Sequence, residues 1–198
     1  MLYTLLLVFL LFSVFPKPTL SENLKPPEHD MFNGSLYAMC RMKPNTQLGS
    51  EMPRVYGHVL FKQTGPEQNL QVMFKLHGLP VNPTKPRAIH IHQYGDMSEG
   101  CTSTGGHYNP ERVNHPLHPG DFGNFIPHNG KIRRAITCGA TLYGGNSVIG
   151  RAVVIHEKED DMGQGGDAGS LLHGNAGARL ACCVIGISSF KPWNKSRS

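Results

Sequence analysis

Six of the eleven histidines, together with one aspartate, stand at positions that could supply ligands for two metal ions. The full set is His90, His92, His107, His115, His118, Asp121 and His156. His90 and His92 are separated by one residue within an extended run, so a strand would present both imidazoles on one face. Imidazole suits copper and zinc, and four nitrogens in a tetragonal arrangement favour Cu(II). Three imidazoles and a carboxylate would make a closed tetrahedral zinc site, so the set is large enough for two metals that share His107.

Short extended runs between turn residues would position these ligands. We expect strands at residues 36–41, 54–63, 69–77, 87–93, 121–126, 131–138, 150–156 and 179–187. This pattern favours an all-β fold, either a Greek-key sandwich or a barrel. Of the two we expect an eight-stranded antiparallel Greek-key β-barrel with a sandwich-like form. Two long connections, 94–120 and 157–178, interrupt the strands. Loops of that length are usually functional or disordered, and we expect function because ligands lie within the first and directly before the second.

The ends of the chain differ in composition from its centre. Residues 1–21 are interpreted as a secretory signal peptide, because 2–15 are apolar, uncharged and too few to span a bilayer. A short membrane anchor is the alternative, and no later segment could span a membrane. We expect a flexible segment at 22–35, the folded domain at 36–190 and a short basic tail at 191–198. Asn33 begins an acceptor sequence for glycosylation, and Asn194 begins a second one near the C-terminus.

Five cysteines in a secreted chain indicate disulfides plus one thiol left over. Cys182 and Cys183 are neighbours in an expected strand, so they face opposite sides and need different partners. Spacing alone leaves the pairing open. We expect Cys138 to be the free cysteine, as a small apolar residue in or beside a strand.

Several long motifs between residues 36 and 188 resemble the copper/zinc superoxide dismutase family. The matching stretches are 88–96 (AIHIHQYGD), 100–103 (GCTS), 107–110 (HYNP), 118–124 (HPGDFGN), 150–156 (GRAVVIH) and 174–182 (GNAGARLAC). The signal peptide, Cys40 and the Cys182–Cys183 pair make the chain most similar to the extracellular vertebrate type.

The resemblance implies one copper ion and one zinc ion per subunit. Copper would be bound by His90, His92, His107 and His156, and zinc by His107, His115, His118 and Asp121. His107 would then be a bridging imidazolate. Asp160 matches a carboxylate that ties a copper ligand to a zinc ligand, which fits the need of ligating imidazoles for a fixed second nitrogen.

The resemblance also implies the activity: two superoxide anions and two protons become dioxygen and hydrogen peroxide as copper cycles between Cu(II) and Cu(I). His107 would pass on a proton, and Arg179 would hold and orient the anion. Zinc, which has no redox chemistry, would order the loop. The disulfides implied are Cys101–Cys182 and Cys40–Cys183. The family further implies a homo-oligomer, either a dimer or a tetramer, in the extracellular space.

Two departures from the family pattern affect the partners that we expect. Residues 167–173 read DAGSLLH, without the lysine that the family carries there, so electrostatic steering of superoxide should be weaker. The chain has no long basic tail, so we expect weak or no binding to heparin or matrix, and no nucleic-acid partner. The alternatives are a dismutase-like protein for copper binding or delivery without turnover, and a matrix-bound module based on the short basic tail.

Overall fold

In the computed structural model of the chain, residues 26–82 and 85–196 are described. The expected signal peptide at 1–21 therefore lies outside the described residues, as do residues 22–25 of the expected flexible segment. Among the helices of the described part, none is long and apolar enough to cross a membrane.

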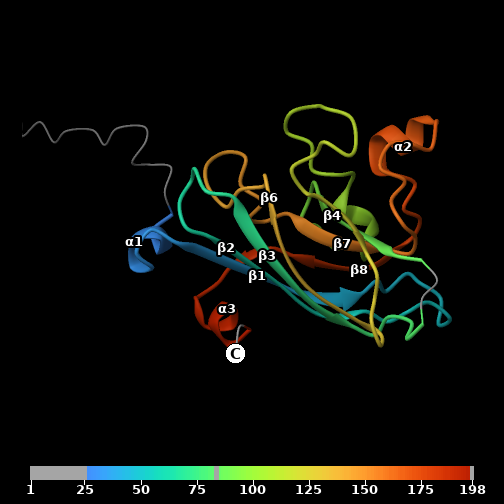
Figure 1. The fold of residues 1–198 in the computed structure, drawn as a ribbon, viewed down its shortest axis with the longest axis horizontal. Coiled ribbons are helices and arrows are strands. Elements are labelled where there is room, and N and C mark those ends of the chain that lie inside the picture. Colours follow the sequence, from blue (N-terminus) through green and yellow to red (C-terminus); the bar gives the residue numbers. More distant parts are fainter. Residues whose placement is uncertain (1–25, 83–84, 197–198) are drawn as a thin grey trace, which may run out of the picture.

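Antiparallel strands make up the body of the molecule (Figure 1). They are β1 Leu36–Pro44, β2 Tyr56–Gln63, β3 Leu70–His77, β4 Arg87–His92, β5 Asp121–Phe125, β6 Lys131–Cys138, β7 Ala152–His156, β8 Arg179–Val184 and β9 Gly186–Ile187. The hydrogen-bonded order is β5-β4-β7-β8-β1-β2-β3-β6, and β9 pairs with β1. The consecutive strands β1, β2 and β3 are neighbours, whereas β4 and β5 cross to the other end of the sheet, which is Greek-key connectivity. The predicted all-β, antiparallel Greek-key barrel is confirmed.

Alternating burial explains why the strands close around one core. In β3, Leu70, Val72, Phe74 and Leu76 are buried, while the residues between them are partly exposed. The Phe74 ring lies 4.8 Å from that of Phe125, so strands from both halves of the sheet meet in the interior. Strand side chains alternate between the two faces, so the residues between these core positions point outward.

The helical segments are short: α1 Glu28–Met31, η2 Thr102–Thr104, α2 Ala168–His173 and α3 Lys191–Lys195. The two long loops, 94–120 and 157–178, contact each other, since His115 N–H donates to the Leu171 carbonyl at 2.9 Å. Figure 1 shows the yellow-green loop and α2 on one side of the barrel, beside β4 and β7, with α3 on the other side. The loops therefore cover the outer face of β4 and β7.

The single strand expected at 179–187 is divided into β8 and β9. Ile185, between them, donates its N–H to the Arg151 carbonyl and accepts from the Gly150 N–H, both at 2.8 Å. Strand β8 pairs with the C-terminal end of β1 and β9 with its middle, so the chain changes register at Ile185. The structure thus adds the two-residue strand β9 to the eight expected strands, because this local shift has no signature in an apolar run.

Both described ends of the chain make aromatic contacts with the domain. Phe32, within the segment expected to be flexible, packs edge-on against the rings of Tyr37 and Phe190, at 5.8 and 5.9 Å. The basic tail begins with α3, which packs against β2 and buries Trp193 to 5 % exposure. Aromatic contacts therefore join residues of the expected flexible segment and of the basic tail to the rest of the domain.

Candidate metal centre

Three imidazoles are fixed by paired strands on the outer face of the sheet. His90 and His92 lie on β4, and His156 ends β7, whose register with β4 places it on the same face. The residues between them, such as Ile89, Ile91 and Ile155, point into the core. All three histidines are buried because the loops cover this face. Nε2 of His92 lies 3.2 Å from Nε2 of His156, so the two rings converge.

His107, from the first long loop, joins this strand cluster to a second group. Its ring centroid lies 4.1 Å from that of His90 and 5.1 Å from that of His92. One ring nitrogen from each of His90, His92, His107 and His156 can meet within 4.8 Å of the others. The same is true of His107, His115, His118 and Asp121, so the structure brings together both predicted ligand sets and places His107 in each.

The Asp121 carboxylate is the centre of the second group. Its Oδ1 lies 2.9 Å from His107 Nδ1, and its Oδ2 lies 2.8 Å from His115 Nδ1 and 2.9 Å from His118 Nδ1. The contacts to His115 and His118 lack hydrogen-bonding geometry, although both nitrogens are buried. The Nδ1 atoms of His115 and His118 therefore lie close to the Asp121 carboxylate but form no hydrogen bond with it.

Asp160 connects the two groups from behind. Its Oδ2 pairs with His90 Nε2 at 2.8 Å, and its Oδ1 pairs with His115 Nε2 at 2.7 Å. The carboxylate is itself fixed, since Met162 N–H donates to Oδ1 at 2.7 Å and Asn124 pairs with the Asp160 backbone. Gly174 packs directly against this carboxylate, where a Cβ would overlap Oδ1. Asp160 thus lies in the place expected of a residue that orients one ligand of each set.

Unsatisfied nitrogens show that the residues fit bound metal. His90 Nδ1 and His107 Nε2 are buried and have no hydrogen-bond partner in the described structure. A buried polar atom without a partner costs free energy, and metal coordination would satisfy both atoms. His107 uses Nδ1 toward the second group, which leaves Nε2 for the first. The donor set of the first group suits copper, and that of the second suits zinc.

The electrostatics favour neutral ligands in the strand cluster. Burial, followed by neighbouring imidazoles, holds the pKa of His92 and of His156 well below the usual value. Burial also lowers the pKa of His107 to about 4. A neutral imidazole can ligate a metal without first losing a proton, so His92, His107 and His156 can bind a metal ion at neutral pH.

His115 behaves differently because two carboxylates flank it. Burial disfavours its charged form, but the close carboxylates of Asp121 and Asp160 outweigh this and raise its pKa to about 9. The same imidazole contacts hold the pKa values of both aspartates well below their usual range, although burial opposes this. In the absence of metal, a proton on His115 therefore balances the carboxylate charge.

Arg179, at the start of β8, is held at the edge of the cavity above His92 and His156. Its Nη1 donates to the carbonyls of Cys101 and Thr102, at 2.8 and 3.1 Å, and to Thr104 Oγ1 at 3.0 Å. The cavity measures about 620 Å³ and is lined by Arg179, four metal-site histidines and residues of α2. A fixed guanidinium beside an open cavity can hold a small anion near the strand cluster.

Two disulfides lie close to these elements, within the described residues. Cys101–Cys182 joins the first loop to β8, and Cys40–Cys183 joins β1 to β8, so the adjacent cysteines do have different partners. Cys138 is unpaired and partly buried, and burial raises the pKa of its thiol to about 11. Among the expected acceptors, Asn33 and Asn194 are both exposed, and their glycosylation stays a prediction.

Residue-by-residue reasoning missed several side chains that position the site. Asn124 fixes the Asp160 backbone, and Thr104 holds Arg179. Asn45 accepts from the Cys101 N–H at 3.2 Å and donates to the Arg179 carbonyl at 3.0 Å. Asn124 belongs to the motif at 118–124, so its presence there was the available signal. Asn45 follows β1 and had no signal, because its contacts depend on the fold.

Comparisons with known proteins agree with this geometry. A family model described as copper/zinc superoxide dismutase matches residues 55–185. The chain is 52 % identical over 162 residues to extracellular superoxide dismutase [Cu-Zn] of Oryctolagus cuniculus, covering 81 % of this chain and 66 % of the relative. For the Homo sapiens protein of the same name the identity is 49 % over 165 residues, covering 82 % and 69 %. Superoxide dismutase [Cu-Zn] of Schizosaccharomyces pombe is 43 % identical over 143 residues, covering 68 % of this chain and 92 % of the relative. The chain thus spans about two thirds of the length of the extracellular relatives.

Proposed function

The chain belongs to the copper/zinc superoxide dismutase family, and we propose that it is a secreted enzyme that converts superoxide to dioxygen and hydrogen peroxide. The balanced reaction consumes two superoxide anions and two protons for each dioxygen and hydrogen peroxide formed. The names of the relatives support an extracellular location. The single observation that carries the activity is His107, which offers one nitrogen to each of two adjoining ligand groups.

We assign copper to the strand cluster of His90, His92, His107 and His156. Zinc is assigned to His107, His115, His118 and Asp121. Copper bound there supplies reversible one-electron transfer, whereas zinc, which keeps one valence, orders the loop. Asp160 holds His90 and His115 through their outer nitrogens, so its role is to orient ligands of both ions.

The remaining residues bind the substrate and deliver protons. Arg179 holds the superoxide anion at the cavity edge, and its three oxygen partners keep the guanidinium from turning away. His107 Nε2 is the atom that we expect to hold the proton for transfer to the reduced anion.

Metal analysis together with a superoxide assay on the purified secreted protein tests this proposal. We expect about one copper and one zinc per chain, together with turnover. A His107→Ala variant should lose turnover and weaken the retention of both metals, since it removes one ligand from each group. Zinc alone, without turnover after copper loading, would instead support a copper-binding or delivery protein.

We also propose that the enzyme forms a dimer or a tetramer. Exposed apolar side chains on adjoining segments support this: Val184, Ile187 and Phe190 are 40, 45 and 42 % exposed. Light scattering of the secreted protein would measure the mass, and a monomer at micromolar concentration would contradict the proposal.

A further inference from the structure

The mouth of the cavity above the metal centre carries a histidine that the proposed mechanism does not use. His173, the last residue of α2, lines this cavity together with Arg179. It is exposed and belongs to neither ligand group. Among the described residues that line the cavity, Arg179 is the only permanently charged one. The remaining titratable lining residues are the metal-site histidines His92, His107, His118 and His156. His173 is therefore the lining residue whose charge can change while the metals stay bound.

A carboxylate lies beside His173. A Cβ added to Gly169 would lie 3.2 Å from His173 Cε1 and 3.1 Å from Asp167 Oδ1, so the ring and the carboxylate flank the same point. Asp167 caps α2 by accepting the Ser170 N–H at 2.9 Å, and the Asn175 amide donates to it at 3.0 Å. These hydrogen bonds, and then the charge of His173, lower the pKa of Asp167. The carboxylate therefore stays ionised at neutral pH, next to the imidazole.

Other charged groups near α2 do not make this rim more positive. Asp161 accepts from the Ser170 hydroxyl at 2.7 Å, so a second carboxylate lies beside the helix. Glu157 and Lys158, which are opposite in charge, both approach Gly177, a lining residue of the cavity. The two aspartates therefore weaken the positive potential that the guanidinium gives to the cavity mouth.

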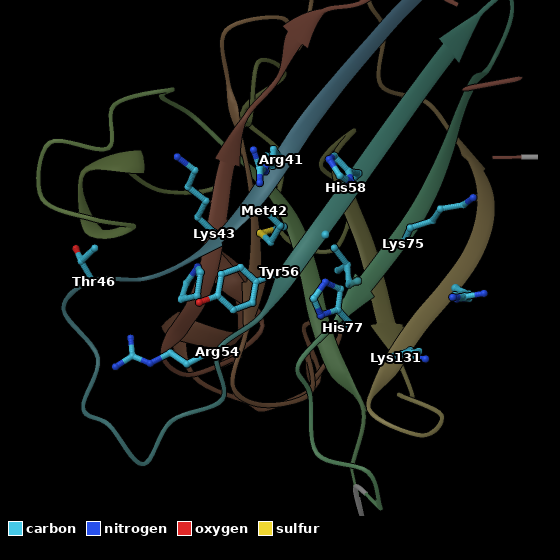
Figure 2. A pocket seen from close by; sticks show the side chains of 14 residues that line it. Arg41, Met42, Lys43, Thr46, Arg54, Tyr56, His58, Lys75, His77 and Lys131 are labelled. Atoms are coloured by element: carbon cyan, nitrogen blue, oxygen red, sulfur yellow. The ribbon is translucent and has the colours of Figure 1, made fainter. Parts of the chain in front are cut away.

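Many of the basic side chains of the chain line a different pocket. Figure 2 shows Arg41, Lys75 and Lys131 around this pocket, which lies over β1, β2, β3 and β6. It shares no lining residue with the cavity above the metal centre. Within residues 167–173, where the family pattern has a lysine, His173 is the only basic residue. A positive charge from this segment of the rim can therefore come only from His173.

We propose that protonated His173 acts with Arg179 to attract superoxide into the cavity, so that the enzyme captures its substrate faster as the pH falls. This inference rests on the dismutase function proposed above. Histidine is the side chain whose charge ordinarily changes between pH 5 and 8. Protonation adds one positive charge beside Asp167, whereas the neutral ring leaves the guanidinium as the only attracting group. The shallow salt dependence expected from the missing lysine should therefore hold at pH 8 and become steeper at pH 6.

Two substitutions test this role in the copper- and zinc-loaded enzyme. His173→Gln keeps a polar side chain without a titrating charge, and His173→Lys keeps the charge at both pH values. At low salt, the second-order rate constant of the wild type should rise about 2-fold from pH 8 to pH 6, as one charge near the entrance would produce in water. The glutamine variant should keep the lower value at both pH values, and the lysine variant the higher one.

Azide provides a binding measurement that does not depend on turnover, because it is a small anion that the reaction does not consume. Its dissociation constant, from a titration of the copper absorption, should be about 2-fold lower at pH 6 than at pH 8 in the wild type. It should be the same at both pH values in His173→Gln. His128→Gln is the matched control, because His128 is exposed and lies outside the cavity lining. This control should keep the wild-type pH profile.

Coincident pH profiles of the wild type and His173→Gln would overturn the proposal, as would a His173→Lys enzyme no faster than the wild type at pH 8. A pH dependence that persists at high salt would also contradict it, because salt screens the attraction of an exposed charge. Metal analysis of each variant should show unchanged copper and zinc. Absence of turnover in every variant, with azide binding that still depends on pH through His173, would refute the dismutase function and support the role of His173.

Discussion

Gly174 provides the most direct test of how Asp160 supports the metal centre. Gly174 follows α2 with φ of 64°, a left-handed conformation, and packs against the Asp160 carboxylate. In a Gly174→Ala variant the new Cβ would overlap Oδ1 and lie 2.7 Å from His115 Nε2. The new Cβ would crowd both atoms of the Asp160–His115 hydrogen bond, so we expect the carboxylate to be displaced.

The size of the effect follows from two contributions. The left-handed conformation costs a non-glycine residue about 1 kcal/mol. Loss of the Asp160 contacts to His90 and His115 should cost about 3 kcal/mol more, since hydrogen bonds to charged groups contribute about 1.5–3 kcal/mol each. For a chain of this size the variant should lower the melting temperature by about 10 °C. Zinc affinity should fall by about 10- to 100-fold.

Gly166→Ala is the matched control. Gly166 lies in the same loop with φ of 79°, but no heavy atom lies within 4 Å of its added Cβ. It should lower the melting temperature by about 3 °C through the backbone cost alone and keep its zinc. Calorimetry and zinc titration against a chelator measure both quantities. Equal melting shifts and equal zinc retention in the two variants would refute the argument that Gly174 protects the Asp160 contact.

Three further outcomes are expected. Arg179→Ala should slow superoxide turnover by at least ~10-fold without loss of either metal, and full activity at low salt would contradict its role in holding the anion. The turnover rate should fall with added salt less steeply than in a cytosolic relative, because residues 167–173 contain no lysine; a steep fall would show that other charges steer the anion. Alkylation of Cys138 should be slow at pH 8 and increase about tenfold per pH unit toward pH 11, because burial raises the thiol pKa to about 11 and only the thiolate reacts. A labelling plateau reached near pH 9 would contradict that pKa.

Local sequence patterns predicted the part of the metal centre that lies on strand β4. The spacing of His90 and His92 in an apolar run was enough to place both rings on one face, because strand side chains alternate. The apolar residues that alternate along β3 likewise form its buried face. The family motifs added His107, Asp160 and Arg179, whose meeting depends on loop paths that no local rule predicts.

Features that depend on register or on distant packing were not predictable from the chain. Arg41, Lys75 and Arg133 are far apart in sequence and form a row only through the pairing of β1, β2, β3 and β6. Trp193 lies within the segment expected as a short basic tail, yet it is buried with α3 against β2. In each case the environment of the side chain is set by a strand that is distant in the sequence.

The oxygens that fix the Arg179 guanidinium belong to a segment fastened covalently through Cys101 and Cys182. Formation of this disulfide would therefore affect how firmly Arg179 is held, although neither cysteine is a metal ligand. A newly synthesised chain with both sulfurs reduced would keep His90, His92 and His156 on their strands but leave the guanidinium free to swing. Competence for turnover would then depend on the oxidation of this cysteine pair as well as on the metal ligands.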